Sequence, residues 1–204
     1  MKQLKLFAIV AVTAATFLGG VAMAQDTSGL VGKTYVSAAA NATDLRSHIT
    51  ANDIYGGTVG VNVAAIPYVD VGGSVQVQRL QDNKLDLNDF NTTVNATTYK
   101  HFGVFTPYIR GTTGFVFERQ NAKHFQAFTY SVAGGAELAL FKNLSVGADY
   151  TVGQLQKATI GGTERSYRGY ATFWLNDHVG VTAGYTYNQA KSSADYAVGT
   201  VVKF

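Results

Sequence analysis

The sequence predicts an all-β protein, a transmembrane antiparallel up-and-down β-barrel of ten strands. The chain of 204 residues ends on Phe204, and its last ten residues alternate between apolar side chains and small or charged ones. Successive residues of a strand point to opposite faces, so this pattern places apolar groups toward lipid and polar groups toward a lumen. Most of the earlier segments alternate in the same way, and the connections between them alternate between short and long.

The N-terminus has the features of a secretory signal peptide. Lys2 and Lys5 precede an apolar run that ends at a small-residue site, Ala22-Met23-Ala24. The run is too short for a membrane-spanning helix, which is the competing interpretation. We therefore expect cleavage after Ala24, which makes 1–24 the signal peptide and 25–204 a single outer-membrane β-barrel domain.

Composition excludes several classes of protein. Removing Lys2 and Lys5 with the signal peptide leaves 14 basic residues against 13 acidic ones, so the basic precursor gives no reason to expect nucleic-acid binding. The chain has no cysteine and is therefore not a disulfide scaffold. It has 22 glycines, only 2 prolines, 12 tyrosines and 12 phenylalanines, a composition that suits a sheet closed on itself. No metal-ligand spacing or phosphate-binding loop occurs in the sequence, and we expect no cofactor.

The elements follow from the alternation, taken in chain order. Strands are expected at 33–40, 53–63, 69–80, 92–102, 107–119, 125–140, 144–152, 167–175, 179–187 and 195–204. Residues 25–32 are expected to be a short leader. Short turns are expected near Pro67, before Pro107, at 141–143 and at 176–178, and longer loops at 41–52, 81–91, 120–124, 153–165 and 188–194. Four short turns with both chain ends on the same side require ten strands. Eight strands is the alternative if one of these turns is false.

Aromatic residues are expected to form two rings on the outer face. The ring toward the long loops comprises Tyr55, Phe117, Phe128, Tyr130, Tyr167, Tyr185, Tyr187 and Tyr196. The ring toward the short turns comprises Phe141, Phe204 and Phe173. Such girdles mark the two interfaces of a membrane barrel. A water-soluble β-sandwich or lipocalin-like barrel, with its apolar faces turned inward, is the alternative.

Two segments resemble small bacterial outer-membrane β-barrel proteins of the opacity and surface-antigen type. Residues 105–115 are similar to the Pro-Tyr-x-x-x-Gly-x-Gly segment of that family through Pro107, Tyr108 and Gly114, although Thr112 stands where a glycine is often found. Residues 170–181 resemble its late strand-turn-strand. The resemblance implies a barrel in the outer membrane of a bacterium. It also implies that the closing strand, with Phe204, Val202 and Tyr196, is the signal read by the barrel-assembly machinery.

The candidate functional site consists of charged residues at the alternate strand positions whose side chains point into the lumen. They are Asp70, Arg110, Glu118, Glu137, Asp149 and Arg168, with Lys203 at the lower rim. These charges either line a narrow aqueous path or neutralise one another and fill the lumen, and the filled lumen is favoured because ten strands leave little room. A hairpin centred between Lys123 and His124 would place Arg110 directly opposite Glu137, so these two are predicted to form an ion pair.

The predicted function is a non-enzymatic surface barrel with a structural role or a contact role through its external loops. Its partners would be outer-membrane lipid and the assembly machinery, with any external ligand or host surface unspecified. A small passive, porin-like channel for ions or small polar solutes is the alternative. A loop-borne hydrolase is a further alternative, because His48 follows Ser47 and lies near Asp44 and Asp53. The other histidines, His101, His124 and His178, fall in or near loops.

Overall fold

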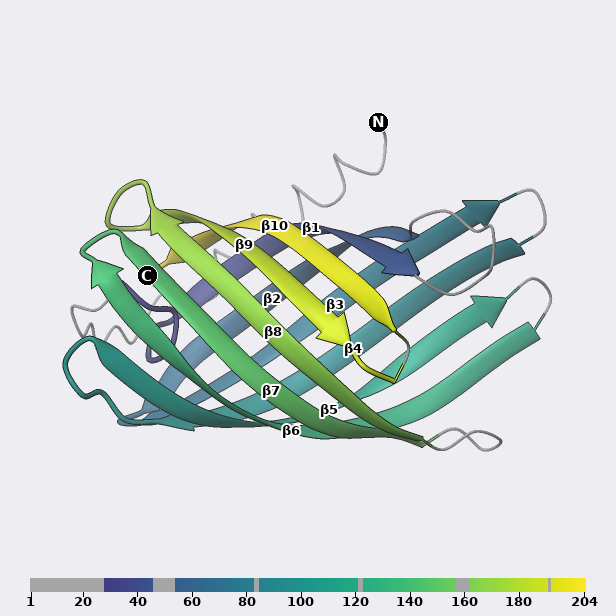
Figure 1. The fold of residues 1–204 in the computed structure, drawn as a ribbon, viewed down its shortest axis with the longest axis horizontal. Coiled ribbons are helices and arrows are strands. Elements are labelled where there is room, and N and C mark those ends of the chain that lie inside the picture. The colour runs from purple at the N-terminus through teal and green to yellow at the C-terminus, as the bar shows by residue number, and fades with distance from the viewer. Residues whose placement is uncertain (1–27, 46–53, 83–84, 121–122, 157–161, 191) are drawn as a thin grey trace.

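The computed structural model describes residues 28–45, 54–82, 85–120, 123–156, 162–190 and 192–204. Its ten strands form one closed barrel (Figure 1). The strands are β1 (Tyr35–Leu45), β2 (Ile54–Ile66), β3 (Val69–Asp82), β4 (Leu85–Tyr99), β5 (Phe105–Gln120), β6 (Lys123–Phe141), β7 (Leu144–Gln156), β8 (Gly162–Trp174), β9 (Val179–Asn188) and β10 (Ser193–Lys203). Among the described residues, no helix is long and apolar enough to cross a membrane.

Each strand pairs antiparallel with its neighbours in sequence, and β1 pairs with β10 to close the ring. The four expected short turns lie at one end of the barrel, on the left in Figure 1, and the longer connections lie at the other end. We call these the short-turn end and the long-loop end. The sequence prediction of ten antiparallel strands is confirmed.

The two faces of the wall differ in polarity in the way the alternation predicted. Outward side chains are apolar and exposed: Val132 is 59% exposed, and Ile109 is 58% exposed. Inward side chains are polar and enclosed, with Glu137 and Asp70 each only 2% exposed. A water-soluble barrel would bury the apolar set. The surface instead presents an apolar band of the kind that lipid covers.

Outward aromatic rings contact one another across neighbouring strands in the half of the barrel nearer the long loops. The ring centroids of Phe115 and Phe128 lie 5.4 Å apart, and those of Tyr150 and Tyr167 lie 4.9 Å apart. Cross-strand aromatic pairs of this kind stabilise a sheet. Phe141, at the short-turn end, is 66% exposed.

The long connections are shorter than the sequence suggested. The region 81–91 was expected to be an acidic loop, but β3 continues to Asp82 and β4 begins at Leu85. Likewise, β1 continues to Leu45, β7 continues to Gln156 and β8 begins at Gly162. The loop predictions were wrong here because a hairpin that extends beyond an apolar band keeps its ladder hydrogen bonds without needing an apolar face.

Candidate functional site

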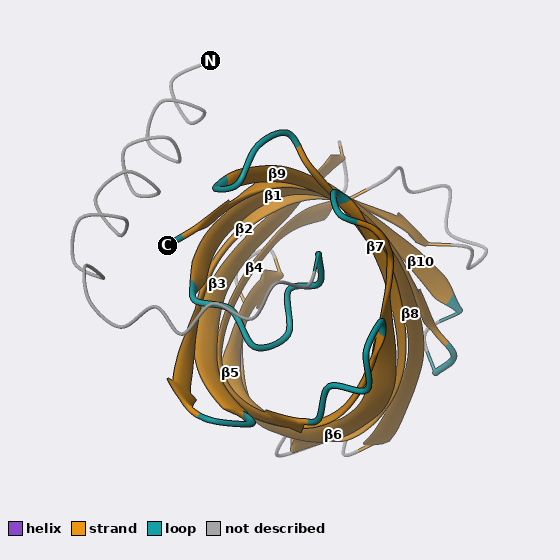
Figure 2. Cartoon of the chain, turned by 90° about the vertical axis from the view of Figure 1, so that its left-hand side faces the viewer, coloured by secondary structure: helices purple, strands orange, loops and turns teal. Residues whose placement is uncertain are grey.

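Residues 28–34, which we call the lumen segment, precede β1 and lie inside the barrel. Figure 2 looks into the short-turn end and shows chain inside the ring of strands there. The Nε1 of Trp174 donates to the carbonyl of Ser28 at 2.6 Å, and the Ser28 hydroxyl donates to the carbonyl of Leu144 at 3.1 Å. The Asn62 amide donates to the carbonyl of Lys33 at 2.8 Å. The segment is thus held by opposite parts of the wall. The sequence analysis treated 25–32 only as a leader and missed this role.

Two inward carboxylates receive backbone N–H groups of the lumen segment. Glu137 accepts from the N–H of Leu30 at 3.2 Å and of Val31 at 3.0 Å. Asp70 accepts from the N–H of Gly32 through Oδ2 at 2.8 Å. Hydrogen bonds to an ionised acceptor are stronger than neutral ones. These two carboxylates therefore anchor the segment, a role that their inward placement alone did not indicate.

Two glycines allow this close approach. Gly32 has φ of +84°, and a Cβ there would lie 3.0 Å from the Tyr99 hydroxyl and 3.1 Å from Nε2 of His101. A Cβ on Gly29 would lie 2.3 Å from the Glu137 carboxylate. A side chain at either position would push the backbone away from its anchor. These glycines are the sequence signal that could have identified the lumen segment.

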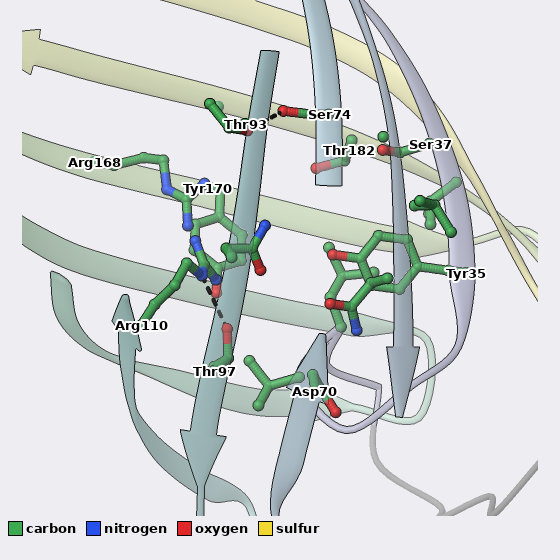
Figure 3. Close-up of a pocket in the computed structure, with 18 of the residues that line it drawn as sticks. Tyr35, Ser37, Asp70, Ser74, Thr93, Thr97, Arg110, Arg168, Tyr170 and Thr182 are labelled. Atoms are coloured by element: carbon green, nitrogen blue, oxygen red, sulfur yellow. Dashed lines mark hydrogen bonds between the residues drawn. The ribbon is translucent and has the colours of Figure 1, made fainter. Parts of the chain in front are cut away.

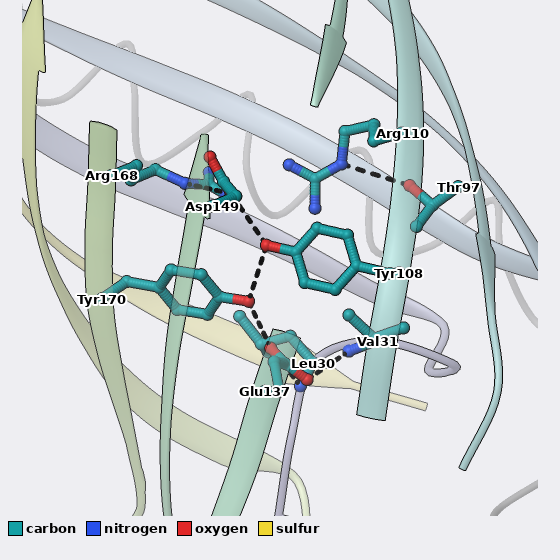
Figure 4. Close-up of polar contacts among 9 residues, drawn as sticks. All are labelled: Leu30, Val31, Thr97, Tyr108, Arg110, Glu137, Asp149, Arg168 and Tyr170. Carbon is teal, nitrogen blue, oxygen red and sulfur yellow. Dashed lines mark hydrogen bonds and ion pairs between the residues drawn. The ribbon is translucent and has the colours of Figure 1, made fainter. Parts of the chain in front are cut away.

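Further polar contacts lie above the lumen segment (Figure 4). Arg168 donates to Oδ2 of Asp149 through Nε at 2.9 Å and Nη2 at 2.5 Å, and the Tyr108 hydroxyl donates to the same oxygen at 2.7 Å. The Tyr170 hydroxyl donates to Glu137 at 2.8 Å. Each tyrosine proton is therefore already committed, so the 3.4 Å approach of the two hydroxyls adds little.

The predicted ion pair between Arg110 and Glu137 is absent from the structure. In the β5–β6 hairpin Gln120 pairs with Lys123, which places Arg110 opposite Ala133 and Glu137 opposite Thr106. The prediction was wrong because the centre of the hairpin lies between 121 and 122 and not between Lys123 and His124, which moves each partner by four residues. The register moved by an even amount, so both side chains still point inward. Nε of Arg110 donates to the Thr97 hydroxyl at 3.2 Å.

Above the lumen segment lies a chamber of about 370 Å³, the inner chamber (Figure 3). Asp70, Arg110, Glu137 and Arg168 line it, and Leu30 and Val31 contribute to its lining from the lumen segment. The rest of the lining combines hydroxyl and amide side chains, among them those of Tyr35 and Tyr170, with small apolar residues and glycines. Four of the six predicted lumen charges therefore meet in one cavity, and Asp149 is tied to it through Arg168.

Toward the long loops the lumen widens into an outer chamber of about 440 Å³. Thr93 and Thr112 line both chambers and mark the boundary between them. The outer lining contains no lysine, arginine or histidine among the described residues. It contains four carboxylates, those of Asp89, Glu118, Glu164 and Asp195. Among the described residues, the charged side chains that line the outer chamber are therefore all acidic.

Three of the four histidines lie in the described part of the chain. His101, in the turn between β4 and β5, has an Nδ1 2.8 Å from the Thr106 hydroxyl, and burial lowers the pKa of its imidazole. His178 lies in the turn before β9, where its backbone N–H donates to the Asn176 side chain. His124 is on β6 near the long-loop end and is exposed.

Ser47, His48 and Asp53 of the hypothetical hydrolase site lie outside the described residues. The described residues contain no group of three or more histidines and carboxylates that could hold a metal ion.

The C-terminal residues lie where the closing strand requires them. Tyr196 and Val202 belong to β10, and Tyr196 is 47% exposed on the outer face. The backbone N–H of Phe204 donates to the carbonyl of Thr34 at 3.1 Å, which continues the pairing of β10 with β1 just beyond the strand. Lys203 points inward, with its Nζ 4.8 Å from the centroid of the Trp174 ring.

No protein-family model and no curated protein matches the chain. Among solved structures, the chain is similar to Neisserial surface protein A, with a TM-score of 0.50 at 13% identity, over 84% of this chain and 97% of that one. It is also similar to the NanC porin, with a TM-score of 0.52 at 9% identity, over 83% of this chain and 100% of that one. These are bacterial outer-membrane β-barrels, and at such identities the likeness shows the fold.

Proposed function

We propose that this protein is a bacterial outer-membrane surface barrel whose lumen is closed at the short-turn end, and that it acts through its external side rather than by conducting solutes. The exposed apolar band and the fold shared with outer-membrane barrels support this location. The lumen segment supports the closed state. It hydrogen-bonds to residues of β2, β3, β6 and β8, and therefore reaches across the lumen.

Single-channel recording of the refolded full-length protein in planar bilayers tests this proposal. The expected result is a silent barrel, because the lumen segment occupies the exit of the inner chamber. Regular conductance steps from intact protein at low voltage would contradict the proposal. Folding would be verified independently by the change in electrophoretic mobility on heating.

A passive channel is the second candidate, and one observation favours it. The two chambers follow one another along the lumen. The inner chamber has a volume of about 370 Å³ and the outer chamber one of about 440 Å³. A ten-stranded barrel thus has room for water and small polar solutes above the lumen segment. In this alternative the segment would have to leave the barrel, and the channel would conduct only after that movement.

We also propose that Phe204 is needed for assembly, as part of the strand that the assembly machinery recognises. Phe204 extends the β10–β1 pairing, and this pairing closes the barrel. Deleting Phe204 should therefore leave most of the protein unfolded in the periplasm. Fractionation of cells that express the deletion measures this, with cells that express the unaltered chain as the control. A normal yield of the Phe204 deletion in the outer membrane would exclude the role.

A further inference from the structure

Of the two guanidinium groups that line the inner chamber, Arg110 is the one that forms no ion pair with a described carboxylate. The inner chamber is lined by two guanidinium groups and two carboxylates. Arg168 is committed to Asp149, whereas Glu137 and Asp70 receive the N–H groups of the lumen segment. Arg110 donates a hydrogen bond to the Thr97 hydroxyl, and its Cζ lies 5.2 Å from the centroid of the Tyr108 ring.

These two contacts fix the guanidinium but do not use its terminal groups. Nε points to Thr97, and the plane of the group lies over an aromatic ring. Its two terminal amino groups have no hydrogen-bond partner among the residues that the structure describes. Arg110 lines the chamber, so these donors border open space (Figure 3). Arg110 shares the chamber with Asp70 and Glu137 but forms no direct ion pair with a described residue, so its terminal donors remain available to a ligand.

We propose that the inner chamber is a binding site for a small monocarboxylate, with Arg110 as its principal ligand-binding residue. A guanidinium presents parallel N–H donors that match the two oxygens of a carboxylate. Tyr35, Asn95 and Thr112 also line the chamber and offer hydroxyl and amide groups to the rest of the molecule. The volume of about 370 Å³ limits the ligand to a small solute.

The lumen segment also sets the route of entry. It closes the floor, so a ligand enters from the long-loop end through the outer chamber. Arg110 offers one set of forked donors, so the site is suited to a solute that carries a single carboxylate.

Nuclear magnetic resonance of the refolded full-length barrel, with ¹⁵N-labelled arginine side chains, tests this site. Sodium acetate should shift the Arg110 Nε resonance in a saturable manner, whereas sodium chloride at the same ionic strength should not. Arg110→Gln should weaken acetate binding about tenfold or more, measured from the remaining resonances of the chamber. Arg110→Lys, which keeps the charge without the forked donors, should also weaken it.

Arg119→Gln is the matched control, because Arg119 lies on the same strand but is exposed and lines neither chamber. It should leave acetate binding unchanged. Unchanged binding in both Arg110 variants, or no saturable shift at Arg110 in the parent protein, would overturn the proposal. Tighter binding of inorganic phosphate than of acetate would overturn the assignment of the ligand as a carboxylate. These outcomes do not depend on whether the barrel conducts.

Discussion

Deleting residues 28–32 is expected to convert the silent barrel into one that conducts. The deletion removes the N–H groups that Glu137 and Asp70 bind and the carbonyl that Trp174 binds, while every strand of the wall remains. The inner chamber then opens at the short-turn end. Planar-bilayer recording should show regular steps from the deleted protein and none from the parent. Silence of a correctly folded deletion would mean that the lumen is filled by its wall alone.

A single substitution, Gly32→Val, should have a weaker effect of the same kind. Valine at φ of +84° is strained by about 1–3 kcal/mol, and each 1.4 kcal/mol is a factor of ten in population. We therefore expect an open probability about five- to a hundredfold above that of the parent. Gly103→Val is the control, since Gly103 also has positive φ, at +63°, but a Cβ there would meet nothing within 4 Å. It should strain the chain without opening the lumen.

Removing the carboxylate of Asp149 should cause the largest loss of stability among single changes at the inward charges. The Asp149 side chain is only 3% exposed and receives the Arg168 guanidinium and the Tyr108 hydroxyl. Asp149→Ala leaves both donors unpaired. Breaking a buried pair in this way costs about 3–5 kcal/mol. The Arg168 side chain is 35% exposed and can reach water, so we expect a value near the lower limit.

Urea unfolding of the refolded protein, followed by the fluorescence of Trp174, the single tryptophan, would measure this loss. The double variant Asp149→Ala with Arg168→Met should be more stable than Asp149→Ala alone, because it no longer leaves a charge unpaired. If the two single losses simply add, the pair contributes no coupling and the interpretation of its geometry is wrong.

The alternation of side chains predicted most of the fold. It depends on a period of two, which is insensitive to errors of a few residues at strand ends. This explains why Arg110 and Glu137 keep the same face of the wall although the predicted register was wrong. The partner of an inward charge depends instead on where the hairpin turns. In the β5–β6 hairpin only residues 121–122 separate the strands. The residues around them are all polar, so the sequence did not indicate where the hairpin turns.

The lumen segment could not have been found from periodicity, because it forms no strand or helix. It is held by backbone N–H and carbonyl groups, which every sequence contains. Only Gly29 and Gly32 distinguish it, and glycines are common throughout this chain. The pairing of Arg168 with Asp149 was hidden for a similar reason. The two residues are opposed across a connection too long to fix the register from its length.

The way the lumen segment is anchored also determines when it can dock during assembly. Its hydrogen bonds join residues separated by 29 positions for Asn62 and by 146 positions for Trp174. Contacts so distant in the chain form late, because the intervening strands must first be ordered. Asn62, Asp70, Glu137 and Trp174 surround one space only once β10 has joined β1. The lumen segment is thus among the last parts of the described chain to reach its final position. It can dock only after the barrel has closed.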